Sequence, residues 1–165
     1  MTRSTSQVKQ STRTVRLYVG GDWDLVEEYN RLQLAKNNPT TLAGTDTARL
    51  EEIRQEILAD TMVFKFRGLG HRSLRKLKDE HPPRQGKPRD QVLGFNEDTA
   101  TDALIHKCIV EPEMSDAALT ELLEEDLSDG QYEELSTAVW QINNRTVDIP
   151  FSLNGSTGPP PGGNG

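Results

Sequence analysis

The chain has 165 residues, of which 33% are apolar and 27% charged, and its formal net charge is −7. This length suits one domain or two small ones, and the composition is that of a polar chain with enough apolar residues for a modest core. The single cysteine, the polar N-terminus and the lack of a long apolar run argue against disulfides, structural zinc, secretion and membrane insertion, so we expect a protein of a reducing cytoplasm.

The first 67 residues predict a strand, a helical hairpin and a second strand. Residues 1–11 are polar and predicted to be disordered. Apolar and polar side chains alternate in residues 12–19 and again in residues 61–67, as in half-buried strands, which places Phe64 and Phe66 in the core. Between the strands, residues 22–36 and about 46–59 have helical periodicity and are joined by a linker over residues 37–45. We therefore expect a module over residues 12–67.

The apolar stripe on each helix of this hairpin is thin, with about one residue per turn. Its members are Leu25, Tyr29 and Leu32 on the first helix and Leu50, Ile53 and Ile57 on the second. Such a stripe does not stabilise a helix pair by itself, so we expect these six residues to bind a partner or to mediate self-association.

Residues 68–151 predict a small helical domain. A basic helix runs from residue 71 to about 80 with Leu74 and Leu77 facing inward, and a basic loop covers residues 84–93. Further helices are predicted over residues 97–110, after Ser115 and after Ser128, with Leu104, Leu119, Leu135 and Val139 in the core. Residues 152–165 are rich in Gly and Pro and predict a disordered tail. The predicted fold class is α+β and mostly helical, with two short β-strands flanking a helical hairpin and then a small C-terminal helical bundle.

The sequence contains no recognisable catalytic constellation. Cys108 ends an apolar stripe and is interpreted as a buried thiol, and the three histidines lack metal-ligand spacing. Gly68 and Gly70 lack the third glycine of a dinucleotide-binding loop and are read as a turn, while the acidic pairs 124–125 and 133–134 diverge on their helices. We expect a protein that is not an enzyme and that uses no cofactor or metal.

Charge is strongly segregated along the chain. Residues 60–92 carry a net charge of +5, whereas residues 93–165 carry −12. The basic segment 65–89 holds nine cations: Lys65, Arg67, Arg72, Arg75, Lys76, Lys78, Arg84, Lys87 and Arg89. Contact with the protein's own acidic helices or with an acidic partner is favoured over nucleic acid, because the chain is acidic overall and the segment has few stacking aromatics. A small nucleic-acid-binding regulator that uses this segment is the alternative function.

Several short segments together resemble a known family. They are Val63 to Gly70 (VFKFRGLG), Leu74 with Leu77, residues 80–84 (EHPPR), residues 93–96 (LGFN), residues 109–114 (IVEPEM) and residues 148–152 (DIPFS). In this order they resemble the tail assembly chaperones of long-tailed, siphovirus-type actinobacterial phages and prophages, over the span from Val15 to Ser152. One difference is Ser73-Leu74, where such proteins often carry a tryptophan.

The resemblance implies a non-catalytic role in virion assembly. Such chaperones coat the long tape-measure protein in the host bacterial cytoplasm until tail-tube subunits polymerise around it, and they are absent from the mature virion. Many also exist in a longer form, produced by ribosomal frameshifting, whose extra domain recruits tail-tube protein. The linker-like residues 155–165 and the codons required by Pro159 to Gly163 are compatible with a frameshift past about residue 158. The alternative is a disordered end without a role.

Overall fold

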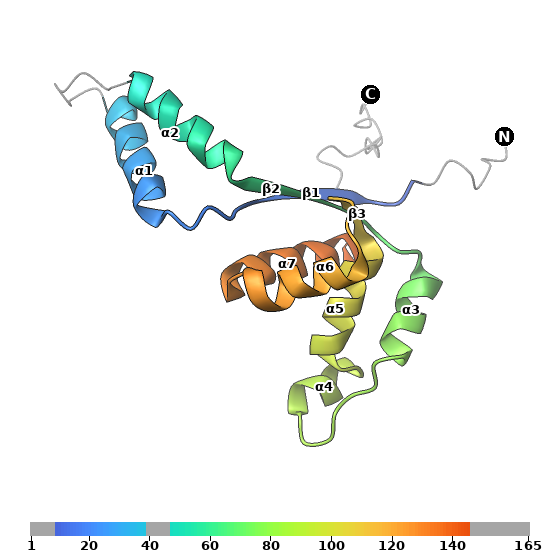
Figure 1. The fold of residues 1–165 in the computed structure, drawn as a ribbon. Helices are drawn as coiled ribbons and strands as arrows, with labels where there is room; N and C mark the ends of the chain where they lie inside the picture. Colours follow the sequence, from blue (N-terminus) through green and yellow to red (C-terminus); the bar gives the residue numbers. More distant parts are fainter. Residues whose placement is uncertain (1–8, 39–46, 146–165) are drawn as a thin grey trace, which may run out of the picture.

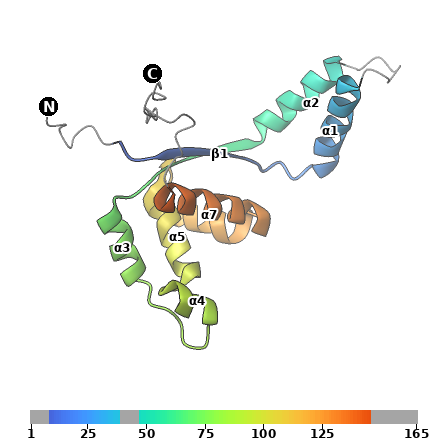
Figure 2. The same ribbon diagram turned by 180° about the vertical axis from the view of Figure 1, so that it is seen from behind.

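The computed structural model describes residues 9–38 and 47–145. A three-stranded antiparallel sheet has helices packed on one face, and a pair of helices projects beyond one end of the sheet (Figures 1 and 2). The fold is α+β and mostly helical, as predicted. The predictions for residues 1–8, for the linker over residues 39–45 and for residues 146–165 lie outside the described residues.

The two predicted strands pair with each other. β1 (Thr12–Tyr18) and β2 (Thr61–Arg67) are antiparallel, with Val15 opposite Phe64 and Leu17 opposite Met62. Because side chains alternate across a strand, these four residues lie on the same face, which is the face that the helices cover.

Two short elements differ from the prediction. β3 (Ile109–Glu111) pairs with β2 and makes it the central strand, although the sequence pattern extends the preceding helix to residue 110. α5 (Glu97–Cys108) ends where Ile109 becomes extended, because the sheet edge offers hydrogen bonds to the β-branched residues that follow. In addition, α4 (Pro88–Leu93) lies within the predicted basic loop. Proline is favourable in the first turn of a helix, and Gly94 ends α4 in the left-handed conformation.

The projecting pair consists of α1 (Trp23–Asn37) and α2 (Thr47–Ala59), and we call it the helical arm. Asp22 caps α1 by accepting a hydrogen bond from the Leu25 backbone N–H at 3.0 Å, as its position in the sequence suggests. In the sequence the arm lies between β1 and β2. In space it extends away from the group of helices α3, α4, α5, α6 and α7 (Figures 1 and 2).

The remaining helices form the layer below the sheet. After α3 (His71–Asp79) and α4, the chain continues through α5, α6 (Asp116–Glu121), the π-helical turn η2 (Leu122–Asp126) and α7 (Asp129–Asn144). α7 begins after Ser128, as predicted, and a capping box is present there, since Ser128 and Gln131 exchange side-chain-to-backbone hydrogen bonds.

One hydrophobic core joins the strands to these helices. Val15 and Leu17 of β1 cluster with residues of β2, α3, α5, α6 and α7, so the chain on both sides of position 67 contributes to the same core. All eight residues that the sequence assigns to the core are buried in this cluster: Phe64, Phe66, Leu74, Leu77, Leu104, Leu119, Leu135 and Val139. Leu50 and Ile53 of the arm are also buried but do not belong to it.

The turn after β2 is held by the end of α7. The Asn143 side chain accepts a hydrogen bond from the Leu69 backbone N–H at 2.7 Å. A Cβ atom at Gly68 would lie 3.1 Å from the carbonyl oxygen of Ile142, so glycine is the residue that fits best at this approach. Gly68 therefore serves the contact between the sheet and α7.

Candidate protein-binding surfaces

The helical arm is held together by packing and by one ion-pair cluster. α1 and α2 lie against each other, and the Arg49 guanidinium donates from Nε and Nη2 to the two oxygens of Glu28, both at 3.1 Å. Arg49 also donates to Glu52 at 2.8 Å. The hydrogen bond from Arg49 holds the pKa of Glu28 below its ordinary value. A bidentate pair of this kind fixes the relative orientation of the helices better than a single contact.

Most of the six predicted partner-binding residues of the arm have partly exposed side chains. Leu50 and Ile53 are buried, which leaves them unavailable for direct contact with another protein. The other four, Leu25, Tyr29, Leu32 and Ile57, are half-buried.

Larger apolar side chains of the arm are exposed elsewhere. Trp23 is 66% exposed and Leu34 is 72% exposed, and Leu58 on α2 is exposed as well. Trp23 and Leu34 are eleven residues apart, which is close to three helical turns, so they project from the same side of α1. We call these two residues the Trp23–Leu34 face. Helical periodicity does not predict this face, because periodicity picks out the side of a helix with the most apolar residues. The Trp23–Leu34 face has only two large apolar residues on an otherwise polar side of α1.

The second predicted surface is the basic helix α3. Its inner side is anchored by Leu74 and Leu77, and Arg72, Arg75 and Lys76 are exposed. Lys76 lies 3.8 Å from Glu80, while Arg72 and Arg75 have no ion-pair partner within residues 9–38 and 47–145. As far as the described part of the chain goes, two arginines of α3 are therefore available to an anionic group.

Most other cations of the basic segment are engaged within the protein. Lys65 lies 3.6 Å from Glu111 across the sheet. The Lys78 ammonium lies over the rings of Phe95 and Trp140, 5.2 and 5.4 Å from their centroids, and these two rings stack on each other. Such contacts reduce the charge that the segment presents to an external partner.

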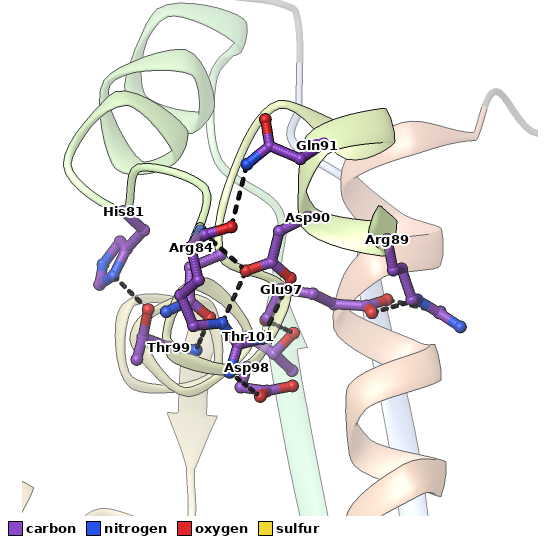
Figure 3. Close-up of polar contacts among 10 residues, drawn as sticks. His81, Arg84, Arg89, Asp90, Gln91, Glu97, Asp98, Thr99 and Thr101 are labelled. Atoms are coloured by element: carbon purple, nitrogen blue, oxygen red, sulfur yellow. Dashed lines mark hydrogen bonds and ion pairs between the residues drawn. The ribbon is translucent and has the colours of Figure 1, made fainter. Parts of the chain in front are cut away.

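Arg84 and Asp90 form the best-organised polar site among the described residues (Figure 3). Asp90 is only 2% exposed and accepts three hydrogen bonds from Arg84, from the backbone N–H at 3.1 Å, from Nε at 2.6 Å and from Nη2 at 3.0 Å. Arg84 also donates to Asp98 at 2.8 Å. The hydrogen bonds from Arg84 lower the pKa of Asp90 to about 2, although burial opposes this shift.

Two neighbouring contacts fasten the connection between α3 and α5 to α5, and a third closes this connection on itself. The ring of His81 is 2.9 Å from the Thr99 hydroxyl, Gln91 donates to the Arg84 carbonyl oxygen at 2.9 Å, and Arg89 donates to Glu97 at 2.7 Å (Figure 3). With its donors aimed at Asp90 and Asp98, Arg84 serves to position the loop between α3 and α5.

The residues considered for chemistry occupy separate places. Cys108 is buried, burial raises the pKa of its thiol, and Asn143 lies 3.5 Å from its sulfur. The His106 ring contacts Asp116 at 3.5 Å and Thr120 at 3.2 Å. Within the described ranges, no three potential ligands among His, Cys, Asp and Glu are grouped as a metal site would require.

A shallow cleft of about 590 Å³ lies where α5 faces α7. The Tyr132 hydroxyl donates to Asp102 at 2.6 Å, and the Trp140 ring N–H donates to Thr101 at 2.9 Å. Burial, followed by the contact with Asp102, raises the pKa of Tyr132. These side chains are thus engaged in joining the two helices.

Among the described helices, none combines the length and apolar character needed to cross a bilayer. Comparisons of the chain with protein-family models, with curated proteins and with solved structures find no match.

Proposed function

We propose that the protein is a non-catalytic phage tail assembly chaperone that binds the tape-measure protein in the host cytoplasm. The observation that carries this proposal is the projecting arm with its exposed Trp23–Leu34 face. An arm that stands away from the core reaches a partner without disturbing that core. Two large apolar side chains about 16 Å apart on one helix suit a long amphipathic helix lying along them.

The identity of the client comes from the ordered segments that resemble this family. A tape-measure protein is long and helical, and its apolar stripes aggregate unless another surface covers them. A chaperone must cover these stripes reversibly, and a binding face of only a few residues, such as the Trp23–Leu34 face, is suited to reversible binding. In the proposed cycle the chaperone leaves as tail-tube subunits polymerise, and a longer, frameshifted form recruits the tail-tube protein.

The test is co-expression with the tape-measure protein, which this proposal expects to be encoded downstream of this chain. With the wild-type chain, we expect most of this client in the soluble fraction. Changing both Trp23→Ser and Leu34→Ser removes the exposed apolar face of α1 and is expected to return the client to the pellet. Val92→Ser is the matched control, because Val92 is 87% exposed on α4 and lies outside the arm.

Two results would count against the chaperone. The first is a client that is equally soluble without this protein. The second is an arm variant that keeps the client soluble as well as the wild type does. Circular dichroism of each variant shows whether the helices are intact, so that loss of folding is not mistaken for loss of binding.

The longer form is tested at the native locus. Mass spectrometry of infected or induced cells should detect a minor product whose peptides continue in another frame past about residue 158. A gene without a slippery run and without an overlapping frame would rule this form out, while leaving the binding of the client to be judged separately.

A further inference from the structure

β1 is an edge strand, and its backbone pattern shows which groups face outward. The Gly68 N–H donates to the Ser11 carbonyl oxygen and the Val19 N–H donates to the Asp60 carbonyl oxygen, both at 2.8 Å. In an antiparallel pair such bonds recur at every second residue. Arg13, Val15 and Leu17 therefore direct their backbone groups to β2, whereas Thr12, Thr14, Arg16 and Tyr18 direct theirs to the open edge.

Among the residues that the structure describes, a side chain closes the open edge at only one of these positions. The Gln131 side chain of α7 donates to the Tyr18 carbonyl oxygen at 2.7 Å. At Thr14 and Arg16, which are both exposed, the backbone N–H and C=O groups have no partner among the described residues. An exposed edge of this kind is a template for an added strand.

A groove runs beside this edge, with a volume of about 410 Å³. Its walls are Arg13, Thr14, Val15 and Arg16 on β1 and Gly130, Glu133, Glu134 and Thr137 on α7. An added Cβ atom at Gly130 would meet nothing within 4 Å, so the α7 side leaves room for the side chains of a further strand.

The charges in the groove specify what that strand carries. α7 runs antiparallel to β1, since Gln131 contacts Tyr18 at one end and Arg13 Nη1 donates to Gln141 at the other. The helix rises about 15 Å over these ten residues, which matches the roughly 16 Å spanned by five strand residues. Glu133 and Glu134 therefore lie near the level of Leu17. A strand added there is favoured by a cation on the side that faces α7.

We propose that the strand is β1 of a second copy of this chain. In an antiparallel pair with Val15 on the two-fold axis, Thr14 pairs with Arg16 of the second copy, which satisfies the free backbone groups of both. Arg13 of the second copy then lies opposite Leu17 and faces Glu133 and Glu134. The same register keeps the two Arg16 side chains from facing each other directly. The two sheets join into one sheet of six strands.

This self-association is independent of the proposed chaperone role, because it uses the edge of β1 and not the helical arm. Its test is the mass of the purified full-length chain by sedimentation velocity over a range of concentrations. We expect a dimer whose dissociation constant rises with salt, because Arg13, Glu133 and Glu134, which pair across the proposed dimer, are all exposed residues.

Two variants of Thr14 isolate the edge. Thr14→Pro removes an N–H that points outward and leaves the β1–β2 hydrogen bonds in place, so we expect a folded monomer. Thr14→Val keeps the N–H and is expected to remain dimeric. A Thr14→Pro protein that dimerises as tightly as Thr14→Val would overturn the proposal.

A charge exchange tests the register without altering the backbone. Arg13→Glu places like charges together and should raise the dissociation constant at least about tenfold, equivalent to about 1.4 kcal/mol. Adding Glu133→Arg and Glu134→Arg to this variant should restore dimerisation. A wild-type chain that is monomeric at all concentrations, or a dimer insensitive to these exchanges, would overturn the proposal, and a strand from an unrelated protein would then be the occupant to seek.

Discussion

At the scale of single residues, the most constrained side chain is Asp90. It is buried in a short helix of a polar loop, and its charge is stabilised by the three hydrogen bonds from Arg84. A buried carboxylate without such donors would be strongly unfavourable. The pair therefore couples the backbone at position 84 to α4 and so fixes the connection between α3 and α5.

The first prediction concerns the pH dependence of this pair. The pKa of Asp90 is lowered from 3.8 to about 2 in the folded state. The ionised carboxylate therefore contributes fully to stability at any pH above the ordinary pKa of 3.8. This contribution is lost as the pH falls from about 4 to about 2. Asp90→Asn should thus lower the urea midpoint at pH 7, and the difference from wild type should shrink over that acidic range.

The control for this experiment is Asp98→Asn. Asp98 also contacts Arg84, but its side chain is 72% exposed, and exposed ion pairs contribute little. Its effect on the urea midpoint should be the smaller of the two. A midpoint difference between wild type and Asp90→Asn that stays constant down to pH 2 would contradict the role given to the carboxylate.

At the scale of elements, the helical arm and the sheet-and-helix core are distinct. The arm buries Leu50 and Ile53 on α2, while none of the described side chains of α1 is fully buried. In the described part of the chain, the core buries sixteen clustered residues, none of which belongs to the arm. Regions with few buried apolar contacts open at lower free energy than a core does.

The second prediction is that Ile53→Ala opens the arm and leaves the core protected. Truncating a buried isoleucine costs about 2–5 kcal/mol, which is large for a pair of helices with so little buried surface. Hydrogen exchange measured by mass spectrometry should show faster exchange over residues 23–37 and 47–59. Exchange over α5 and α7 should stay close to that of the wild type.

Leu58→Ala is the matched control for the arm, because Leu58 is half exposed and lies on the same helix. It should leave the exchange of both regions nearly unchanged. If Ile53→Ala accelerated exchange equally in α5 and α7, the arm and the core would form one cooperative unit.

At the scale of the whole molecule, the charge segregation of the sequence is partly resolved by folding. The cations Lys65, Arg84 and Arg89 each pair with acidic residues, and Lys78 lies over two aromatic rings. Arg67, Arg72, Arg75 and Lys87 have no ion-pair partner among the described residues. Four cations of the basic segment without a described partner are a small footprint for a nucleic acid on a chain of net charge −7.

The third prediction is that the protein does not bind duplex DNA measurably at physiological salt. Binding through about six phosphates would weaken roughly a thousandfold between 50 and 200 mM salt. Fluorescence anisotropy of a labelled duplex over this salt range distinguishes a protein that binds DNA from one that does not. Tight, steeply salt-dependent binding that is lost on changing Arg72, Arg75 and Lys76 to Glu would favour the nucleic-acid-binding regulator over the chaperone.

The sequence by itself determined the local elements and the inward side of each. The alternation of apolar and polar residues predicted which faces of β1 and β2 are buried. Helical periodicity predicted the buried faces that carry Leu104 on α5 and Leu135 and Val139 on α7. Ser128 marked the start of α7. These features depend on interactions between residues a few positions apart, so they are readable from a single chain.

Tertiary structure decided what depends on distant partners. β3 forms because β2 offers it an edge, Asp90 is buried because Arg84 and α5 surround it, and the edge of β1 stays open because the only side chain that reaches it among those described is Gln131. The exposure of Trp23 likewise follows from where the arm points. Such outcomes depend on which surfaces meet in space, and a periodic pattern in one segment does not contain that information.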